Sequence, residues 1–123
     1  MKKKILLVDE EPDITSTFKT GLEEKGFDVD AFNDPLLALS KFKAGMYDIV
    51  LLDIRMPNMD GFDLYKELQR IDSKTKVCFV TAFEVYYEAL RELFPDSRVE
   101  CFIRKPVGID ELVGHINKEL SAM

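Results

Sequence analysis

Five chemically active side chains in this sequence lie at the end of short apolar runs. Asp9 and Glu10 follow ILLV, Asp53 follows IVLL, Thr81 ends KVCFVT, and Lys105 comes shortly after CFI. Three carboxylates held together raise one another's pKa unless a cation compensates their charge. Mg²⁺ takes oxygen ligands, commonly one or two carboxylates together with water and phosphate oxygens. The set therefore predicts a magnesium site, provided that the fold gathers these residues.

Asp53 is the predicted nucleophile of this set, because it is the acid that ends the central apolar run. A carboxylate can attack a phosphoryl donor to give an aspartyl phosphate, a known covalent use of Asp. Asp9 and Glu10 are then the predicted metal ligands, while Lys105 supplies a positive charge and Thr81 a hydrogen-bond donor. Each residue alone has an ordinary explanation as a loop, cap or strand residue, so the prediction depends on the whole set.

An alternation of strand and helix patterns is what would position these side chains. The helical patterns have apolar residues spaced by three and four, and the apolar runs between them predict strands. Alternation of this kind predicts an α/β fold, a doubly wound parallel sheet with helices on both faces, in which ligands bind beyond the carboxyl ends of the strands. The predicted strands are Ile5 to Val8, Phe27 to Phe32, Asp48 to Leu52, Lys76 to Thr81 and Val99 to Ile103. The five predicted helices have these apolar stripes, in chain order: Ile14, Phe18 and Leu22; Ala38, Leu39 and Phe42; Leu64, Leu68 and Ile71; Ala89, Leu90 and Leu93; and Ile109, Leu112, Val113, Ile116 and Leu120.

Length and charge exclude several classes of protein. A chain of 123 residues with 46% hydrophobic content is sufficient for one domain, residues 1–123, around one core. The 17 basic and 23 acidic residues give a net charge of -6, which argues against direct nucleic-acid binding. The first apolar run is too short for a signal peptide or membrane span, so a cytoplasmic protein is expected. His115, the single histidine, has no Cys or His partners at zinc-ligand spacing.

The two cysteines, Cys78 and Cys101, lie in apolar surroundings and show no C-x-x-C spacing. They are expected to be reduced core thiols of a cytosolic protein. A disulfide is the alternative if their strands prove to be neighbours.

Four motifs in order give the sequence a resemblance to the receiver domain of two-component response regulators. They are ILLVDEEPDI, IVLLDIRMPNMDGF, FVTAF and CFIRKP, and the resemblance covers essentially the whole chain. It implies the flavodoxin-like (βα)5 fold of the chemotaxis response regulator, with a five-stranded parallel sheet of order 2-1-3-4-5. It also implies a signalling phosphoacceptor that assists its own phosphorylation and dephosphorylation, and not an enzyme that turns over substrate.

The resemblance assigns roles to the metal-binding positions. Asp53 resembles the phosphoacceptor, and Glu10 the direct Mg²⁺ ligand, with Asp9 acting partly through water. Asp53 itself and the backbone carbonyl of Arg55 complete the coordination. Many family members have Asp at both positions of the acidic pair, so the longer Glu10 is a departure.

The same resemblance assigns the signalling residues and partners. Thr81 resembles the switch hydroxyl, Phe102 the switch aromatic residue, and Lys105 the lysine that pairs with the phosphoryl group. A histidine kinase or phosphotransfer protein would be the donor, and an unknown effector protein or domain would bind the face of the fourth helix, fifth strand and fifth helix. A phosphorylation-dependent dimer through that face is an alternative. Tyr86 and Tyr87 fit either a partner patch there or core packing.

Two other functions compete with this interpretation. A phosphatase of the haloacid-dehalogenase type also uses an aspartate nucleophile with Mg²⁺, but it requires D-x-D after its first strand, whereas Asp53 follows the third. A phosphorylation-independent interaction module with the same fold is the second alternative. The sequence fits both a stand-alone protein and the receiver part of a longer regulator.

Overall fold

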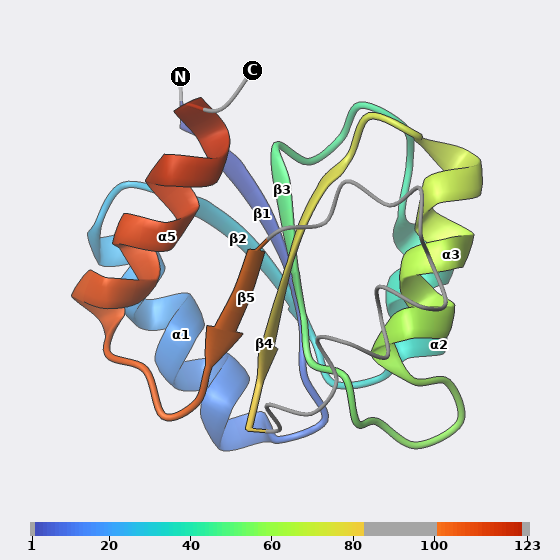
Figure 1. The fold of residues 1–123 in the computed structure, drawn as a ribbon, viewed down its shortest axis with the longest axis horizontal. Helices are drawn as coiled ribbons and strands as arrows, with labels where there is room; N and C mark the ends of the chain where they lie inside the picture. Colours follow the sequence, from blue (N-terminus) through green and yellow to red (C-terminus); the bar gives the residue numbers. More distant parts are fainter. Residues whose placement is uncertain (1, 83–100, 122–123) are drawn as a thin grey trace.

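A parallel five-stranded sheet lies between two layers of helices in the computed structural model, which describes residues 2–82 and 101–121 (Figure 1). The strand order is β2-β1-β3-β4-β5, and all neighbouring strands are parallel. The predicted fold class and strand order are therefore confirmed. The strands are β1 (Lys4–Val8), β2 (Asp28–Phe32), β3 (Ile49–Leu52), β4 (Lys76–Thr81) and β5 (Cys101–Arg104).

Helices α1 and α5 cover one face of the sheet, and α2 and α3 cover the other (Figure 1). Their bounds are α1 (Pro12–Glu24), α2 (Pro35–Lys41), α3 (Gly61–Ile71) and α5 (Ile109–Ser121). None of the helices in the described part of the chain has the length and apolar character needed to span a membrane. The predicted fourth helix, with Tyr86 and Tyr87, and the start of the last predicted strand at Val99 lie outside the described residues.

Local signals in the sequence explain where these helices begin and end. Asp34 caps α2 by accepting a hydrogen bond from the Leu36 N–H at 2.9 Å, and proline occupies the first helical position. Glu11 precedes α1 in the same way, but its side chain makes no capping hydrogen bond. Gly26 adopts φ of 95° just after α1, a backbone conformation that favours glycine and turns the chain toward β2.

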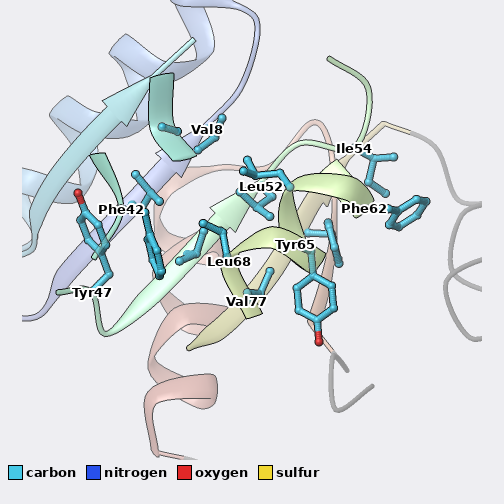
Figure 2. Close-up of a cluster of buried hydrophobic side chains, with 14 residues drawn as sticks. Val8, Phe42, Tyr47, Leu52, Ile54, Phe62, Tyr65, Leu68 and Val77 are labelled. Atoms are coloured by element: carbon cyan, nitrogen blue, oxygen red, sulfur yellow. The ribbon is translucent and has the colours of Figure 1, made fainter. Parts of the chain in front are cut away.

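The core consists of two hydrophobic clusters, one on each face of the sheet. Leu6, Val50 and Phe79 point toward α2 and α3, while their neighbours Leu7, Leu51 and Val80 belong to the cluster under α1 and α5. Figure 2 shows side chains of the first cluster, where strand residues meet aromatic rings from the helices and loops. Because both faces of β3 are buried, this strand is apolar at every position, as is typical of the central strands of a parallel sheet.

Cys78 and Cys101 form a disulfide in the structure, so the prediction of free thiols was wrong. The two residues are direct partners in the register between β4 and β5, and their Cα atoms are 4.6 Å apart. Both side chains are buried in the cluster beneath α5. The disulfide therefore joins the strand that ends at Thr81 to the strand that leads to Lys105.

Reduction of this disulfide is expected to lower the free energy of unfolding. The bond closes a loop across a sequence separation of 23 residues. Opening a loop of that length returns entropy to the unfolded chain that corresponds to about 3 kcal/mol in the chain-entropy model. Urea denaturation with and without a thiol reductant measures the difference. A variant with both cysteines replaced by alanine serves as control and should not respond to reductant; identical curves for the parent in both conditions would refute the expectation.

Candidate functional site

The predicted chemical residues meet at one edge of the sheet because they follow parallel strands. Asp9 comes directly after β1, Asp53 after β3, and Lys105 after β5, while Thr81 is the last residue of β4. Backbone hydrogen bonds continue the strand pairing into these positions. The Asp53 N–H donates to the Val8 carbonyl at 2.9 Å, and the Lys105 N–H donates to the Thr81 carbonyl at 2.8 Å. The hydrogen bonds of the sheet therefore fix the backbone positions of Asp53 and Lys105.

An ion triad forms the centre of the site. The Lys105 Nζ lies 2.5 Å from Asp9 Oδ2 and 3.6 Å from Asp53 Oδ2. The two carboxylates are almost fully buried, with 2% of Asp9 and 8% of Asp53 exposed. The second oxygen of each has its own donor: Asp53 Oδ1 accepts from the Ile54 N–H at 2.8 Å, and Asp9 Oδ1 accepts from the Glu11 N–H at 3.0 Å.

The single ammonium does not compensate for both buried acids. Burial and, to a smaller extent, the charge of Asp9 raise the pKa of Asp53 to about 6, although Lys105 and the hydrogen bond from the Ile54 N–H oppose this rise. For Lys105, burial lowers the pKa, but the hydrogen bond with Asp9 and the charge of Asp53 outweigh burial and raise it overall. Two carboxylates that still lack positive charge are suited to a further cation.

A cavity of about 480 Å³ opens beside this triad. Glu10 lies at its rim as an exposed residue of the loop after β1. The other lining residues come from the loop after β3 and the start of α3: Ile54, Arg55, Met56, Pro57, Asp60 and Phe62. The site thus has open space on the side where Asp53 leads into its loop.

The donors at this edge fit Mg²⁺ in chemical type. Asp9 and Asp53 offer buried carboxylate oxygens, and Mg²⁺ commonly needs only one or two carboxylates besides water. The structure brings these two acids together but leaves Glu10 at the cavity rim. Within residues 2–82 and 101–121, no three acidic, cysteine or histidine side chains are grouped to hold a metal ion as they stand. Direct ligation by Glu10 would therefore require its side chain to turn toward Asp53.

Close backbone packing holds the loop that carries Asp53. The Gly61 N–H donates to the Ile54 carbonyl at 2.7 Å, which ties the start of α3 to the residue after Asp53. A Cβ at Gly61 would overlap the Asp53 carbonyl oxygen. Asp60 caps α3 by accepting from the Asp63 N–H at 2.8 Å. Asp60 therefore caps the helix, and Gly61 permits its close contact with the backbone of Asp53 and Ile54.

Thr81 and Phe102 occupy the neighbouring strands β4 and β5. Thr81 is 5% exposed. The Phe102 ring stacks on Phe79, its register partner in β4, with a centroid distance of 5.5 Å. The aromatic side chain is thus partly buried against the core cluster that lies under α3.

Asn33 is a residue at this edge that the sequence analysis did not consider. It directly follows β2, and its side-chain amide donates to the Asp9 carbonyl at 2.8 Å. The signal was available, since the same rule of polar residues after strands identified Asp9 and Asp53. Asn33 was overlooked because Asp34 and Pro35, which follow it, are explained as a helix cap.

Lowering the pH from 7 to 5 in the absence of metal is expected to raise the free energy of unfolding through Asp53. The carboxyl has a pKa of about 6 in the folded protein and an ordinary value of 3.8, so the folded state binds its proton more tightly. The stabilisation from the Asp53 proton is fully present below about pH 3.8 and is lost as the pH rises through 6. A shift of roughly two units corresponds to at most about 3 kcal/mol over the whole titration, of which roughly 1 kcal/mol is gained between pH 7 and pH 5.

Urea denaturation in EDTA at several pH values measures this effect. Asp53→Asn is the control, because it retains all other titrating groups and lacks this one. The difference between parent and variant isolates Asp53, and pH profiles that run parallel would contradict the expectation.

Comparison with known proteins identifies a family for the chain. Residues 5–117 match the family model of the response regulator receiver domain. The transcriptional regulatory protein TrcR of Mycobacterium tuberculosis is 31% identical over 92% of this chain, which covers 43% of TrcR. The regulatory protein AtoC of Escherichia coli is 36% identical over 89% of the chain, which covers 23% of AtoC. The chain thus spans less than half the length of these two relatives.

Solved structures agree in fold. The response regulator TrrA of Thermotoga maritima, in complex with Mg(2+)-BeF, has a TM-score of 0.83 and 32% identity, with 95% of this chain and 98% of that chain covered. A structure of the histidine kinase ThkA in complex with TrrA matches with a TM-score of 0.82 and 33% identity, covering 97% and 99% of the two chains. The chain therefore belongs to the response regulator receiver domain family of two-component signalling.

Proposed function

We propose that Asp53 accepts a phosphoryl group from a phosphorylated histidine of a kinase or phosphotransfer protein. One observation carries the proposal: Asp53 is a buried carboxylate beside Lys105, and the next residue, Ile54, lines a cavity of about 480 Å³. In the reaction, a carboxylate oxygen of Asp53 bonds to phosphorus as the bond from phosphorus to the donor nitrogen breaks. The nitrogen retains the electron pair of that bond.

The chain's own residues prepare this step. With a pKa of about 6, Asp53 is largely ionised at pH 7 and so has the lone pair that attack requires. The Ile54 N–H orients one carboxylate oxygen, and Lys105 offers a positive charge to the incoming phosphoryl oxygens. Asp9, Glu10, Asp53 and the Arg55 carbonyl would hold Mg²⁺, which supplies charge neutralisation for those oxygens.

The output follows from the charge that phosphorylation adds at this edge. A phosphoryl group brings a charge of about -1.5 to -2 and three strong acceptor oxygens. Thr81 and Lys105 are the donors at the ends of β4 and β5 that could bind them, and Phe102 is the aromatic residue of β5 that stacks on Phe79 of the core. A nearly complete switch requires a bias of about 5 kcal/mol between two states, which several charge-assisted hydrogen bonds and a metal are able to supply.

The proposed partners are a histidine kinase and an effector protein or domain that binds the face containing β5 and α5. The complex of TrrA with ThkA supports the first, and the greater length of TrcR and AtoC supports an attached effector domain in relatives. We place this exchange in the cytoplasm. Dimerisation through the same face after phosphorylation is a further form that the output could take.

Intact-mass spectrometry after treatment with acetyl phosphate and Mg²⁺ tests the proposal. The protein should gain the mass of one phosphoryl group, and peptide mapping should place that group on Asp53. EDTA should prevent the gain. A protein that stays unlabelled under these conditions would overturn the proposal and leave a phosphorylation-independent interaction module as the function.

A further inference from the structure

The turn from β1 into α1 presents the two acids that precede Glu11. The Asp9 carboxylate is held by the Glu11 N–H and by Lys105. Glu10, between these held residues, is exposed at the rim of the cavity. The position of Glu10 relative to Asp53 is therefore determined by the backbone of this turn.

That backbone is hydrogen-bonded to the end of β2 through both the N–H and the carbonyl of Asp9. The Asp9 N–H donates to the Phe32 carbonyl at 3.1 Å, and the Asp9 carbonyl accepts from the Asn33 amide at 2.8 Å. The carbonyl can only accept, so the amide nitrogen of Asn33 must face it. Phe32 and Asn33, at the end of β2, thus both form hydrogen bonds with Asp9, at the end of β1.

The same amide also reaches the first turn of α1. Asn33 Nδ2 lies 2.9 Å from Thr15 Oγ1, and the Thr15 hydroxyl donates to the Pro12 carbonyl at 3.1 Å. Thr15 is only 5% exposed, whereas Asn33 is an exposed residue. An amide nitrogen has two hydrogens, and here one is directed to each side of Glu10: to Asp9 before it and to Thr15 after it.

We propose that Asn33 is a positioning residue for the metal site, which acts by bridging the end of β1 to α1 so that Asp9 and Glu10 are presented toward Asp53. This inference rests on the proposed function, because it assumes that these acids hold Mg²⁺. Partners that orient metal ligands from the next layer typically change metal affinity by about 10- to 100-fold when they are removed. Since the Asn33 side chain is partly solvated, we expect the lower end of that range.

The competing explanation is that Asn33 only adds stability to the fold. Gln69 provides a matched control, since its side-chain amide also donates to a backbone carbonyl, that of Thr75 at 3.2 Å. Thr75 precedes β4, so this bond lies at the opposite edge of the sheet from Asp53. Alanine at either position removes an amide-to-carbonyl bond, but only one of the two bonds lies at the proposed metal site.

Titration of the full chain with MgCl₂, followed by backbone amide NMR, tests the proposal on the parent, Asn33→Ala and Gln69→Ala. We expect Asn33→Ala to bind Mg²⁺ about tenfold more weakly than the parent and Gln69→Ala to bind it as the parent does. Before metal is added, the Glu10 and Glu11 amide signals should shift in Asn33→Ala and not in Gln69→Ala.

Three results would overturn the inference, and they separate it from the proposed function. Equal affinity in the parent and Asn33→Ala, or equal weakening in both variants, would reject Asn33 as a positioning residue while leaving Asp53 as the phosphoacceptor. A parent that shows no saturable Mg²⁺ binding would reject both the inference and the metal-dependent function.

Discussion

Asp53→Asn is expected to abolish phosphoryl labelling completely while the protein remains folded. The amide has nearly the same shape and can still accept the hydrogen bond from the Ile54 N–H, but it lacks the negative charge that makes a carboxylate oxygen nucleophilic toward phosphorus. Its stability at pH 7 should exceed that of the parent, because the substitution removes a buried charge whose pKa is raised by burial and by Asp9. Replacing one carboxylate oxygen of Asp53 by an NH₂ group is thus expected to abolish labelling and to increase stability.

Intact mass after treatment with acetyl phosphate and Mg²⁺ measures the label, and urea denaturation in EDTA measures stability. Asp63→Asn is the matched control: it makes the same chemical change on α3, where the side chain is 58% exposed, and it should label as the parent does. Retention of the label by Asp53→Asn would show that another residue is the acceptor. Loss of label together with unfolding would show that the carboxylate is needed for the fold.

The positions of the strand ends could be predicted from the sequence because burial on both faces leaves a local signal. Ile49–Leu52 is apolar at every residue, and the first polar residue after it is Asp53. Parallel pairing then brings Asp9, Asp53 and Lys105 to one edge without further information. The fold and the meeting of these residues at one edge could therefore be predicted from apolar runs of only four or five residues.

Side-chain pairings between strands could not be predicted in the same way. The register that opposes Cys78 to Cys101 is a pairing between residues distant in sequence, and neither strand carries a local signal for it. The closer pairing of Lys105 with Asp9 than with Asp53 likewise depends on rotamers at a buried triad. Asn33 illustrates a third limit: its place after a strand was visible in the sequence, but its hydrogen bonds to Asp9 and Thr15 leave no spacing pattern.

Gly61→Ala is expected to destabilise the protein and to slow phosphorylation at Asp53. The added Cβ would overlap the Asp53 carbonyl oxygen and lie 2.9 Å from the Ile54 Cα. Both are backbone atoms, so the strain cannot be relieved by rotating a side chain. Either the start of α3 moves away and loses the hydrogen bond from the Gly61 N–H to the Ile54 carbonyl, or the loop that carries Asp53 moves.

The expected cost of this overpacking is about 1 to 3 kcal/mol in the free energy of unfolding. Displacement of the acceptor by about 1 Å can reduce the rate of a positioned reaction on the order of 100-fold, so we expect labelling by acetyl phosphate to slow by at least about tenfold. Time-resolved intact mass gives the rate, and urea denaturation gives the stability.

Gly114→Ala supplies the control, because among the described residues a Cβ placed there in α5 would meet no atom within 4 Å apart from its chain neighbours and the adjacent backbone of its own helix. Alanine favours a helix over glycine by about 0.5 to 1 kcal/mol, so this variant should be slightly more stable than the parent and label at the parent rate. The two substitutions add the same methyl group, and only the one beside Asp53 should impair the reaction. If Gly61→Ala labels as fast as Gly114→Ala, the close approach of α3 to the Asp53 backbone does not position the acceptor.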